Sequence, residues 1–286
     1  MPRYDTVSFL SDYGRVDEFV GVVHSVIRSI APEVRVIDIT HDIPVYDVRA
    51  GGLALVRAAN YLAPGVVVAV IDPTVGTPRR PIAVEIGGGS SVLVGPDNGV
   101  LAPVVQLCGG ADRAVEIVNP DYRFTTEPGT FDGRDVFAPA AAHLCNGVDL
   151  SELGPAIDPI SLFPAMIPLT REEEGRLHAE VLWVDHYGNA QLNVDPDELE
   201  AFDETIRLVM DDGSRVARRV GTFADLDPNE IGLIVDSYGL VAIVLDKHSA
   251  AEELGLSSTS AVTFEQFDET RPPSIITPVQ LGQRRT

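Results

Sequence analysis

The sequence predicts two domains of different class: an N-terminal α/β domain with a mainly parallel sheet between helices, and a smaller all-β, antiparallel, barrel-like C-terminal domain. Three observations support this prediction. The chain of 286 residues is longer than most single compact cores. Its first half alternates apolar strands with segments of helical spacing, whereas its second half consists of short strands. A proline-rich stretch separates the two halves.

The first half is expected to form buried strands joined by amphipathic helices. Short apolar runs predict the strands, and apolar residues at intervals of three and four predict the helices. The predicted strands are residues 6–10, 34–39, 66–71, 82–86 and 92–94. The predicted helices are residues 17–30, 47–62 and the end of 130–145. Strand–helix–strand alternation indicates a parallel sheet covered on both faces.

The second half is expected to form a small barrel or sandwich. Four prolines between residues 155 and 168 lie in a stretch without periodicity, which predicts a linker between domains. The boundaries that follow are an α/β domain at 1–160, a linker at 161–175, a β domain at 176–270 and a loose tail at 271–286. The predicted strands of the β domain are 177–184, 190–194, 206–210, 231–235, 241–245 and 261–264, with one short helix at 250–254.

The charge balance excludes some classes of function. The chain has 43 acidic and 21 basic residues, a formal net charge of −22 that repels nucleic acid and is compatible with a small cationic ligand. No apolar run approaches the roughly 20 residues that a membrane span needs, so we expect no membrane association and a cytoplasmic protein. The six histidines show no metal-ligand spacing, and no metal site is predicted.

Asp72 marks a candidate site at the end of an apolar strand. A turn rich in proline and glycine follows it, and Arg79 comes seven residues later. Enzymes with α/β sheets bind their ligands at the carboxyl ends of the strands, so an acid and a base here indicate a site. The alternative is an ion pair that only closes the turn.

Six different short polar motifs are distributed over the two halves. They are FLSDYG (9–14), DPTVGTPRR (72–80), VGPDNG (94–99), TFDGRD (130–135), DHYGN (185–189) and DSYG (236–239). In this order and spacing the chain resembles the S-adenosylmethionine (SAM) hydrolases, or SAM hydroxide adenosyltransferases, sister enzymes of the SAM-dependent fluorinase and chlorinase. The resemblance extends to about residue 265. No motif is decisive alone, but the ordered set is specific.

The resemblance implies nucleophilic substitution at the ribose C5′ of SAM. Water or hydroxide attacks in line and methionine leaves, which yields adenosine and L-methionine. Because the sulfonium is already an activated leaving group, no cofactor is implied. The resemblance also implies a homotrimer, with each nucleoside pocket between the N-terminal domain of one subunit and the C-terminal domain of its neighbour.

The resemblance assigns substrate-binding roles to three polar residues. Asp12 would accept hydrogen bonds from both ribose hydroxyls, a task that suits a carboxylate. Asp17 would hold the methionine ammonium and Ser237 the methionine carboxylate. From the residues alone, Asp12 could instead cap a turn and Asp17 could cap the following helix, and both kinds of role can coexist.

Three further residues fall at nucleoside-binding positions of the family. Tyr187 and Asn189 match the loop that faces adenine, where an aromatic ring and an amide suit a purine. Tyr46 matches an aromatic residue over the ribose in the halogenases. Turn chemistry explains Tyr187 and Asn189 equally simply, and Tyr46 could be an ordinary surface residue. Asn98 is interpreted as a tight-turn residue.

The catalytic set departs from the family pattern at one position. The hydrolases use Asp, Arg and His to position and polarise water; Asp72 and Arg79 match the first two, but Asp132 stands where the histidine is expected. A carboxylate cannot donate a hydrogen bond unless protonated, and it repels Asp72 unless Arg79 lies between them. It can still accept a proton from water. The residues Arg134 and Asp135 are expected to pair structurally.

The sequence therefore predicts a SAM hydrolase and leaves open whether Asp132 reduces its activity. One alternative is a catalytically impaired protein that binds SAM or adenosine. A halogenase is the weaker alternative, since halide-binding relatives carry a neutral residue at the position of Asp72, and its charge would expel an anion.

Overall fold

The structure, a computed structural model, describes residues 3–125 and 129–268. The chain forms two compact units and passes from the first to the second between Ile167 and Pro168. Each unit has its own hydrophobic core. The predicted loose tail, residues 271–286, lies outside the described residues.

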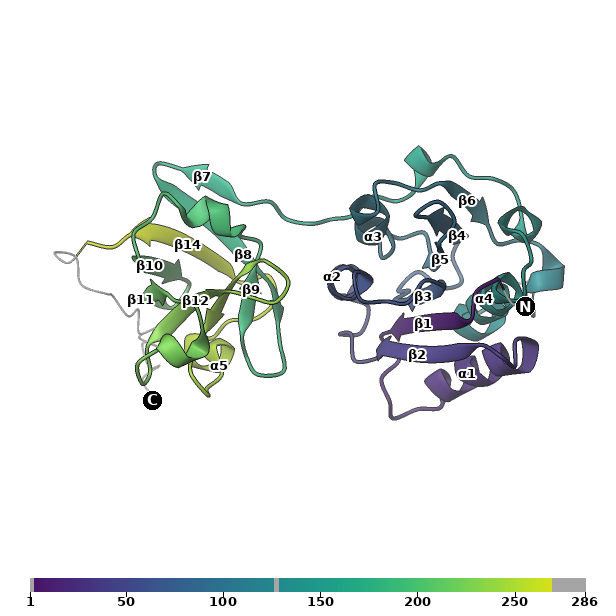
Figure 1. Ribbon diagram of the computed structural model, residues 1–286, viewed down its shortest axis with the longest axis horizontal. Coiled ribbons are helices and arrows are strands. Elements are labelled where there is room, and N and C mark those ends of the chain that lie inside the picture. Colours follow the sequence, from purple (N-terminus) through teal and green to yellow (C-terminus); the bar gives the residue numbers. More distant parts are fainter. Residues whose placement is uncertain (1–2, 126–128, 269–286) are drawn as a thin grey trace, which may run out of the picture. The chain divides into compact units, whose positions relative to one another are not determined.

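The first unit is built on a six-stranded sheet, with the strand order β2-β1-β3-β5-β4-β6 (Figure 1). Strands β2, β1, β3 and β5 are mutually parallel, whereas β4 is antiparallel to both of its neighbours. The bounds are β1 Thr6–Ser11, β2 Arg35–Thr40, β3 Val66–Val70, β4 Pro81–Ile86, β5 Ser91–Pro96 and β6 Arg113–Glu116. The prediction of a mainly parallel sheet is confirmed.

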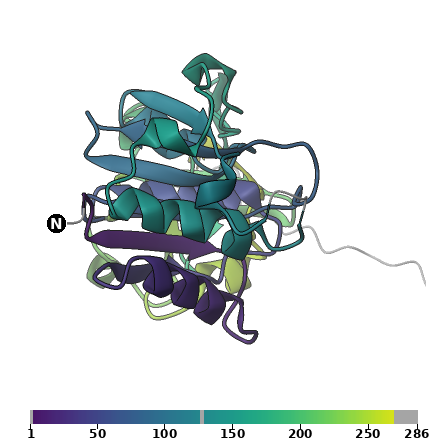
Figure 2. The same ribbon diagram turned by 90° about the vertical axis from the view of Figure 1, so that its right-hand side faces the viewer.

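Helices cover both faces of this sheet. On one face α1 (Phe19–Ile30) packs against α4 (Ala138–Cys145), and Figure 2 looks onto these two helices. On the other face α2 (Val48–Ala59) packs against α3 (Ala102–Leu107). The unit therefore has three layers with one core on each side of the sheet.

Strand β3 shows why its sequence, VVVAV, is apolar throughout. Side chains alternate between the two faces of a strand, so Val66, Val68 and Val70 enter the core beneath α1 and α4. Val67 and Ala69 enter the opposite core. A strand covered on both faces needs apolar residues at every position. Asp72 comes two residues after the end of β3 and therefore lies at the carboxyl edge of the sheet.

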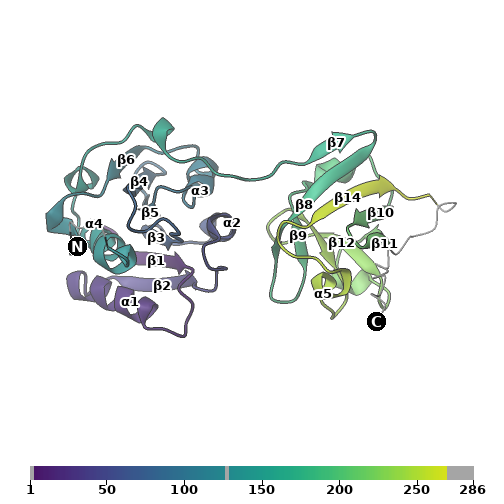
Figure 3. The same cartoon turned by 180° about the vertical axis from the view of Figure 1, so that it is seen from behind.

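The second unit is a closed barrel of seven strands (Figures 1 and 3). The order is β14-β10-β11-β12-β13-β9-β8, and the pairing of β14 with β8 closes the ring. Only the β11–β12 pair is parallel. The bounds are β8 Arg176–Val184, β9 Ala190–Leu192, β10 Thr205–Met210, β11 Gly213–Arg219, β12 Ile231–Val235, β13 Val241–Val244 and β14 Ala261–Gln266. The short strand β7 (Arg171–Glu173) pairs antiparallel with the start of β8, and α5 spans Ala250–Leu254. The barrel-like prediction is confirmed.

Four of these helices and strands were not predicted: α3, β6, β7 and β11. Strand β11 has the sequence GSRVARR, whose three arginines hide its strand character, and β6 and β7 have only four and three residues. Helix α1 begins at Phe19 rather than at Asp17. Among the described residues no helix has the length and apolar character that crossing a bilayer requires.

The proline-rich stretch is divided between the two units. Its first part pairs with β6 of the first unit: the Glu116 backbone N–H donates to Pro155, and that of Ile157 donates to Ala114. Arg80 also donates to the backbone carbonyl and the hydroxyl of Ser161. A proline has no backbone N–H to donate, but its carbonyl group can still accept a hydrogen bond from an edge strand. A segment without secondary-structure periodicity can therefore be fixed against the sheet.

Candidate active site

Arg79 joins Asp72 and Asp132 in one cluster. Its Nε lies 2.9 Å from Asp72 Oδ2, its Nη2 also donates to that oxygen, and the same Nη2 lies 2.5 Å from Asp132 Oδ2. The side chains of Asp72, Arg79 and Asp132 are only 6%, 9% and 13% exposed. Burial alone would lower the pKa of Arg79, but its hydrogen bonds and charge interactions with both carboxylates outweigh burial and raise it. The guanidinium is therefore a permanent positive charge between two acids.

The turn after β3 fixes Asp72 in place. Its Oδ1 accepts hydrogen bonds from the backbone N–H and the hydroxyl of Thr74, at 3.3 and 3.1 Å. Gly76 has a φ of +79°, a conformation that glycine adopts without strain, and it turns the chain so that Arg79 returns to Asp72. Both oxygens of Asp72 are thus engaged by neighbours. By contrast, Asp132 Oδ1 accepts no hydrogen bond from any described residue.

Asp132 immediately precedes a π-helical turn, Gly133–Phe137, that leads into α4. Such turns are rare and occur frequently at functional sites. Here the turn places Asp132 at the cavity, while the predicted structural pair forms next to it: Arg134 donates two hydrogen bonds of 2.7 Å to the two carboxylate oxygens of Asp135.

Asp12 and Tyr46 complete a cavity of about 290 Å³ that also contains Asp72 and Asp132. The backbone N–H of Tyr46 lies 2.9 Å from Asp12 Oδ2. Tyr46 has a φ of +68°, an unfavourable conformation for a residue with a side chain, which a functional constraint often explains. Burial raises the pKa of Asp12, the hydrogen bond from Tyr46 opposes this shift, and the charge of Asp72 adds to it.

The structure does not bring Asp17 to this cavity. Asp17 is exposed, and the residue that precedes the first turn of α1 is Glu18, which makes no capping hydrogen bond with its side chain. The alternative role of Asp17 as the helix cap is therefore wrong. Asn98 does have the predicted turn role: its Nδ2 lies 2.8 Å from the Ile71 carbonyl, and its Oδ1 accepts from the Val100 backbone.

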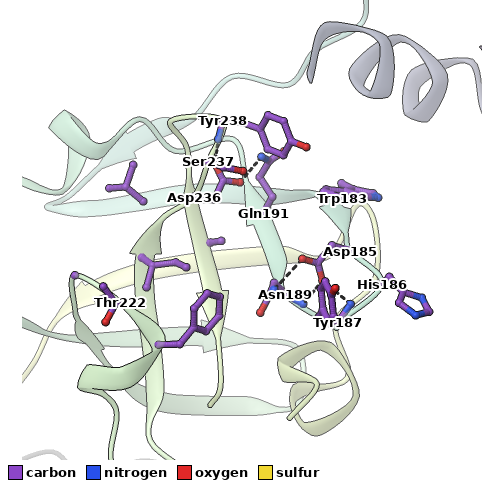
Figure 4. A pocket seen from close by; sticks show the side chains of 15 residues that line it. Trp183, Asp185, His186, Tyr187, Asn189, Gln191, Thr222, Asp236, Ser237 and Tyr238 are labelled. Atoms are coloured by element: carbon purple, nitrogen blue, oxygen red, sulfur yellow. Dashed lines mark hydrogen bonds between the residues drawn. The ribbon is translucent and has the colours of Figure 1, made fainter. Parts of the chain in front are cut away.

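A second cavity, of about 600 Å³, lies in the barrel unit and contains Tyr187, Asn189 and Ser237 (Figure 4). In the turn between β8 and β9, Asp185 accepts hydrogen bonds from the backbone N–H groups of Tyr187 and Asn189, each at 2.9 Å. Its other oxygen accepts from Asn189 Nδ2 at 2.8 Å. The Asn189 amide is thus fixed, while Tyr187 as a whole residue is 78% exposed.

The turn between β12 and β13 forms the other wall of the second cavity. Asp236 accepts from the backbone N–H of Tyr238 at 2.8 Å and from Gln191 Nε2 at 2.5 Å (Figure 4). Ser237 lies exposed at the tip of this turn. The two turns share the pattern Asp-x-Tyr-Gly, and the glycine has a φ of +84° in both. Turn chemistry and ligand binding are therefore compatible explanations of the same motif.

Three residues with metal-ligand side chains, His24, Asp38 and His41, meet in the first unit. Asp38 Oδ1 lies 2.7 Å from His24 Nε2 and 3.1 Å from His41 Nε2. The shorter distance is that of a hydrogen bond, and it is shorter than the roughly 3.3 Å between two ligands of a tetrahedral zinc ion. His41 Nδ1 lies 2.7 Å from Ser11 Oγ. We therefore interpret the cluster as a set of hydrogen bonds that holds Ser11, the residue before Asp12, in place. Sequence spacing could not reveal it, because its members come from two elements.

Sequence reasoning missed several residues that line the cavities. In the first cavity they are Tyr13, Phe19, Val45, Val70, Val75, Thr130, Phe131 and Gly133; in the second they include Trp183, Gln191 and Phe223. Tyr13 and Phe131 lie inside two of the polar motifs and so carried a signal. Phe19 and Phe223 carried none, since an isolated aromatic residue is more often part of the core.

The first cavity favours a cation. Its lining has three carboxylates, and the guanidinium of Arg79 pairs with two of them, so the group has a formal charge of −2 when all four are ionised. Such a site attracts a positively charged ligand and repels a halide ion. Asp132 Oδ1 is the one carboxylate oxygen of the catalytic candidates without a described partner, so it is the best placed to accept a proton.

Comparisons with known proteins identify the family of the chain. The family model for the SAM hydroxide adenosyltransferase N-terminal domain matches residues 7–154, and the model for the C-terminal domain matches residues 179–263. A protein of Salinispora tropica named (R)-S-adenosyl-L-methionine hydrolase is 43% identical over 251 residues, which cover 88% of this chain and 94% of that protein. A fluorinase of Actinopolyspora mzabensis is 27% identical over 288 residues, 90% of this chain and 95% of its own.

A solved structure shows the same architecture. The crystal structure of a conserved protein from Thermotoga maritima has a TM-score of 0.83 and 31% sequence identity, covering 91% of this chain and all of that one. The two family models together match most of the chain, in the order and at the positions of its two units. This chain belongs to the SAM hydroxide adenosyltransferase family.

Proposed function

We propose that the protein is an enzyme that hydrolyses S-adenosyl-L-methionine to adenosine and L-methionine. The observation that carries this proposal is the buried Asp72–Arg79–Asp132 cluster beside Asp12 in a negatively charged cavity. Membership of the family and the name of the Salinispora relative support it. That name specifies an (R) form of the substrate, so the two sulfur epimers of SAM are to be tested separately.

The reaction follows from the properties of the cluster. Water attacks C5′ of the ribose, the new C5′–O bond forms, and the C5′–S bond breaks with its electron pair moving to sulfur. The sulfonium becomes the neutral thioether of methionine, and the attacking water loses a proton. Asp132 Oδ1 accepts that proton and passes it to solvent, while Arg79 fixes both carboxylates. Negative charge around the site stabilises the positive charge that develops on the attacking water.

The binding residues have complementary tasks in this proposal. Asp12, held by the Tyr46 backbone, accepts the ribose hydroxyls, and the Tyr46 ring lies against the sugar. Tyr187 and Asn189 receive the adenine, and Ser237 binds the methionine carboxylate. Asp17 holds the methionine ammonium. Its exposure leaves it free to meet a ligand, although it lies outside the first cavity.

The proposal requires the two cavities to serve one ligand. We propose that they do so in a homotrimer, where the first unit of one subunit meets the second unit of a neighbour. Light scattering would give the mass of the assembly, and a monomer that binds SAM with full affinity would contradict this arrangement. No cofactor is needed, because the sulfonium needs no further activation. Cytoplasmic location stays a prediction that cell fractionation can check.

The decisive experiment is incubation of the purified protein with each SAM epimer, followed by chromatography of adenosine and methionine. The Asp132→His and Asp132→Asn variants are measured beside it. We expect turnover by the native chain and by Asp132→His. Asp132→Asn keeps the shape but removes the proton acceptor, so it should lose about 10²–10⁴-fold in kcat. If the native chain and Asp132→His both bind SAM without turnover, the protein is a SAM-binding protein and not a hydrolase.

A further inference from the structure

Tyr13 is a cavity residue with a rigidly held ring. Its ring forms T-shaped pairs with Phe9 and Phe131, with ring centroids 6.2 and 5.5 Å apart. The centroid of the Phe19 ring lies 5.8 Å away. Its backbone N–H donates to Ser11 Oγ at 3.3 Å. Aromatic neighbours on several sides and a tethered backbone leave the phenol little freedom to rotate away.

The hydroxyl of Tyr13 lies directly over Gly133, the residue after Asp132. A Cβ atom at position 133 would lie only 2.2 Å from Tyr13 Oη. The hydroxyl therefore occupies the place that a side chain at position 133 would need, which explains the glycine. It also brings a polar group against the backbone next to Asp132.

The Tyr13 hydroxyl has no hydrogen-bond partner among the described residues. It shares its cavity with the carboxylates of Asp12, Asp72 and Asp132, which can accept but not donate hydrogen bonds when ionised. Burial, reinforced by these three charges, raises the pKa of Tyr13 well above its usual range, so the hydroxyl keeps its proton at neutral pH. Tyr13 is thus a neutral donor that faces a space suited to water or substrate.

We propose that the Tyr13 hydroxyl is a catalytic donor: it hydrogen-bonds the oxygen of the attacking water and so replaces the donor that the family pattern supplies with a histidine at position 132. This inference rests on the proposed hydrolysis. The water then has a donor on one side and a proton acceptor, Asp132 Oδ1, on the other. One lone pair of the water is held by Tyr13, and the other is free to attack C5′ while the proton moves to Asp132.

The test is a double-mutant cycle between Tyr13→Phe and Asp132→His. Tyr13→Phe keeps the ring and removes only the hydroxyl. In the native background it should lower kcat about 10–100-fold, with KM and the calorimetric Kd for adenosine changed by less than about threefold. In the Asp132→His background a donor is restored, so the same substitution should cost less than about threefold. Tyr122→Phe is the matched control, because its ring packs on His143 away from the cavity, and it should keep native kcat.

The possible results separate this inference from the function on which it rests. If the native chain hydrolyses neither epimer of SAM, the proposed function fails and the role of Tyr13 fails with it. If the native chain is active and Tyr13→Phe keeps full kcat, only the role of Tyr13 is overturned. An equal loss of kcat in both backgrounds, or a loss matched by weaker adenosine binding, would also overturn it by assigning Tyr13 a packing role.

Discussion

Arg79 and Asp132 lie 53 residues apart in the sequence, yet Arg79 Nη2 and Asp132 Oδ2 are 2.5 Å apart in a nearly buried pair. The same guanidinium holds Asp72 on its other side. Two carboxylates so close together would repel each other strongly without it. The replacement of the expected histidine by Asp132 is therefore accommodated electrostatically, and the site keeps one carboxylate oxygen, Asp132 Oδ1, free of described partners.

Replacing Arg79 should destabilise the fold as well as the site. Arg79→Met keeps much of the side-chain length but leaves Asp72 and Asp132 buried without their cation. Breaking a buried pair from one side costs about 3–5 kcal/mol of the free energy of unfolding. Urea denaturation measures this loss. Arg171→Met is the control, because its exposed pair with Glu173 should contribute less than about 1 kcal/mol. Equal losses in the two variants would contradict the central role of Arg79.

Binding of SAM or adenosine should weaken at mildly acidic pH because of Asp12. Its pKa is raised, chiefly by burial, above the usual value of about 3.9. As the pH falls, Asp12 takes up a proton earlier than an exposed aspartate and loses one acceptor for the ribose hydroxyls. Calorimetric titration with adenosine between pH 4 and 7.5 would follow this. Asp12→Asn should bind more weakly at pH 7.5 and should lack this acid-dependent loss; an unchanged pH dependence in that variant would rule out Asp12 as its source.

Stability should decline below about pH 6.5 because of His41. Burial lowers its pKa in the folded state, although the hydrogen bond to Asp38 opposes the shift. The unfolded state therefore binds a proton first, and stability falls as the pH drops from about 6.5 towards the folded pKa, by up to about 1.4 kcal/mol per pH unit. His143, whose pKa is also lowered by burial, acts in the same window.

The measurement for His41 is the unfolding free energy between pH 5 and 7.5. His41→Gln should be less stable at pH 7.5, because it loses the contacts with Ser11 and the Phe9 ring. Its stability should nevertheless decline less steeply between pH 6.5 and 5 than that of the native chain. Parallel curves for the two proteins would show that His41 does not titrate in this range.

A side chain at position 133 should cost less stability when the Tyr13 hydroxyl is removed. In Gly133→Ala the new Cβ collides with Tyr13 Oη at 2.2 Å, and such overpacking typically costs about 1–3 kcal/mol. In the double variant with Tyr13→Phe the hydroxyl is gone, although ring carbons remain 3.1–3.2 Å from the Cβ position. The double variant should therefore have a higher melting temperature than the Tyr13→Phe and Gly133→Ala losses would give when added together. A double variant less stable than the sum of the single changes would contradict the packing described.

Much of the α/β unit was predictable because four of its strands, β1, β3, β4 and β5, are almost entirely buried. The apolar run of β3 identified both the strand and the position of Asp72 after it, and the order of motifs identified the family. Strand β11 was not predictable in the same way, because its arginines are accommodated by tertiary partners: Arg218, for example, pairs with Glu230. The apolar and polar pattern within a strand does not reveal an ion-pair partner twelve residues away in the sequence.

By itself the sequence determined the two classes of domain, the family and the positions of Asp12, Asp72, Arg79 and Asp132. These follow from periodicity and motif order, which are properties of neighbouring residues. Only the tertiary structure decided that Arg79 lies between two acids and that the Tyr13 hydroxyl covers Gly133. It also separated Asp17 from the cavity. The physical reason is that hydrogen bonds and collisions depend on distances in space, which packing sets between segments far apart in the chain.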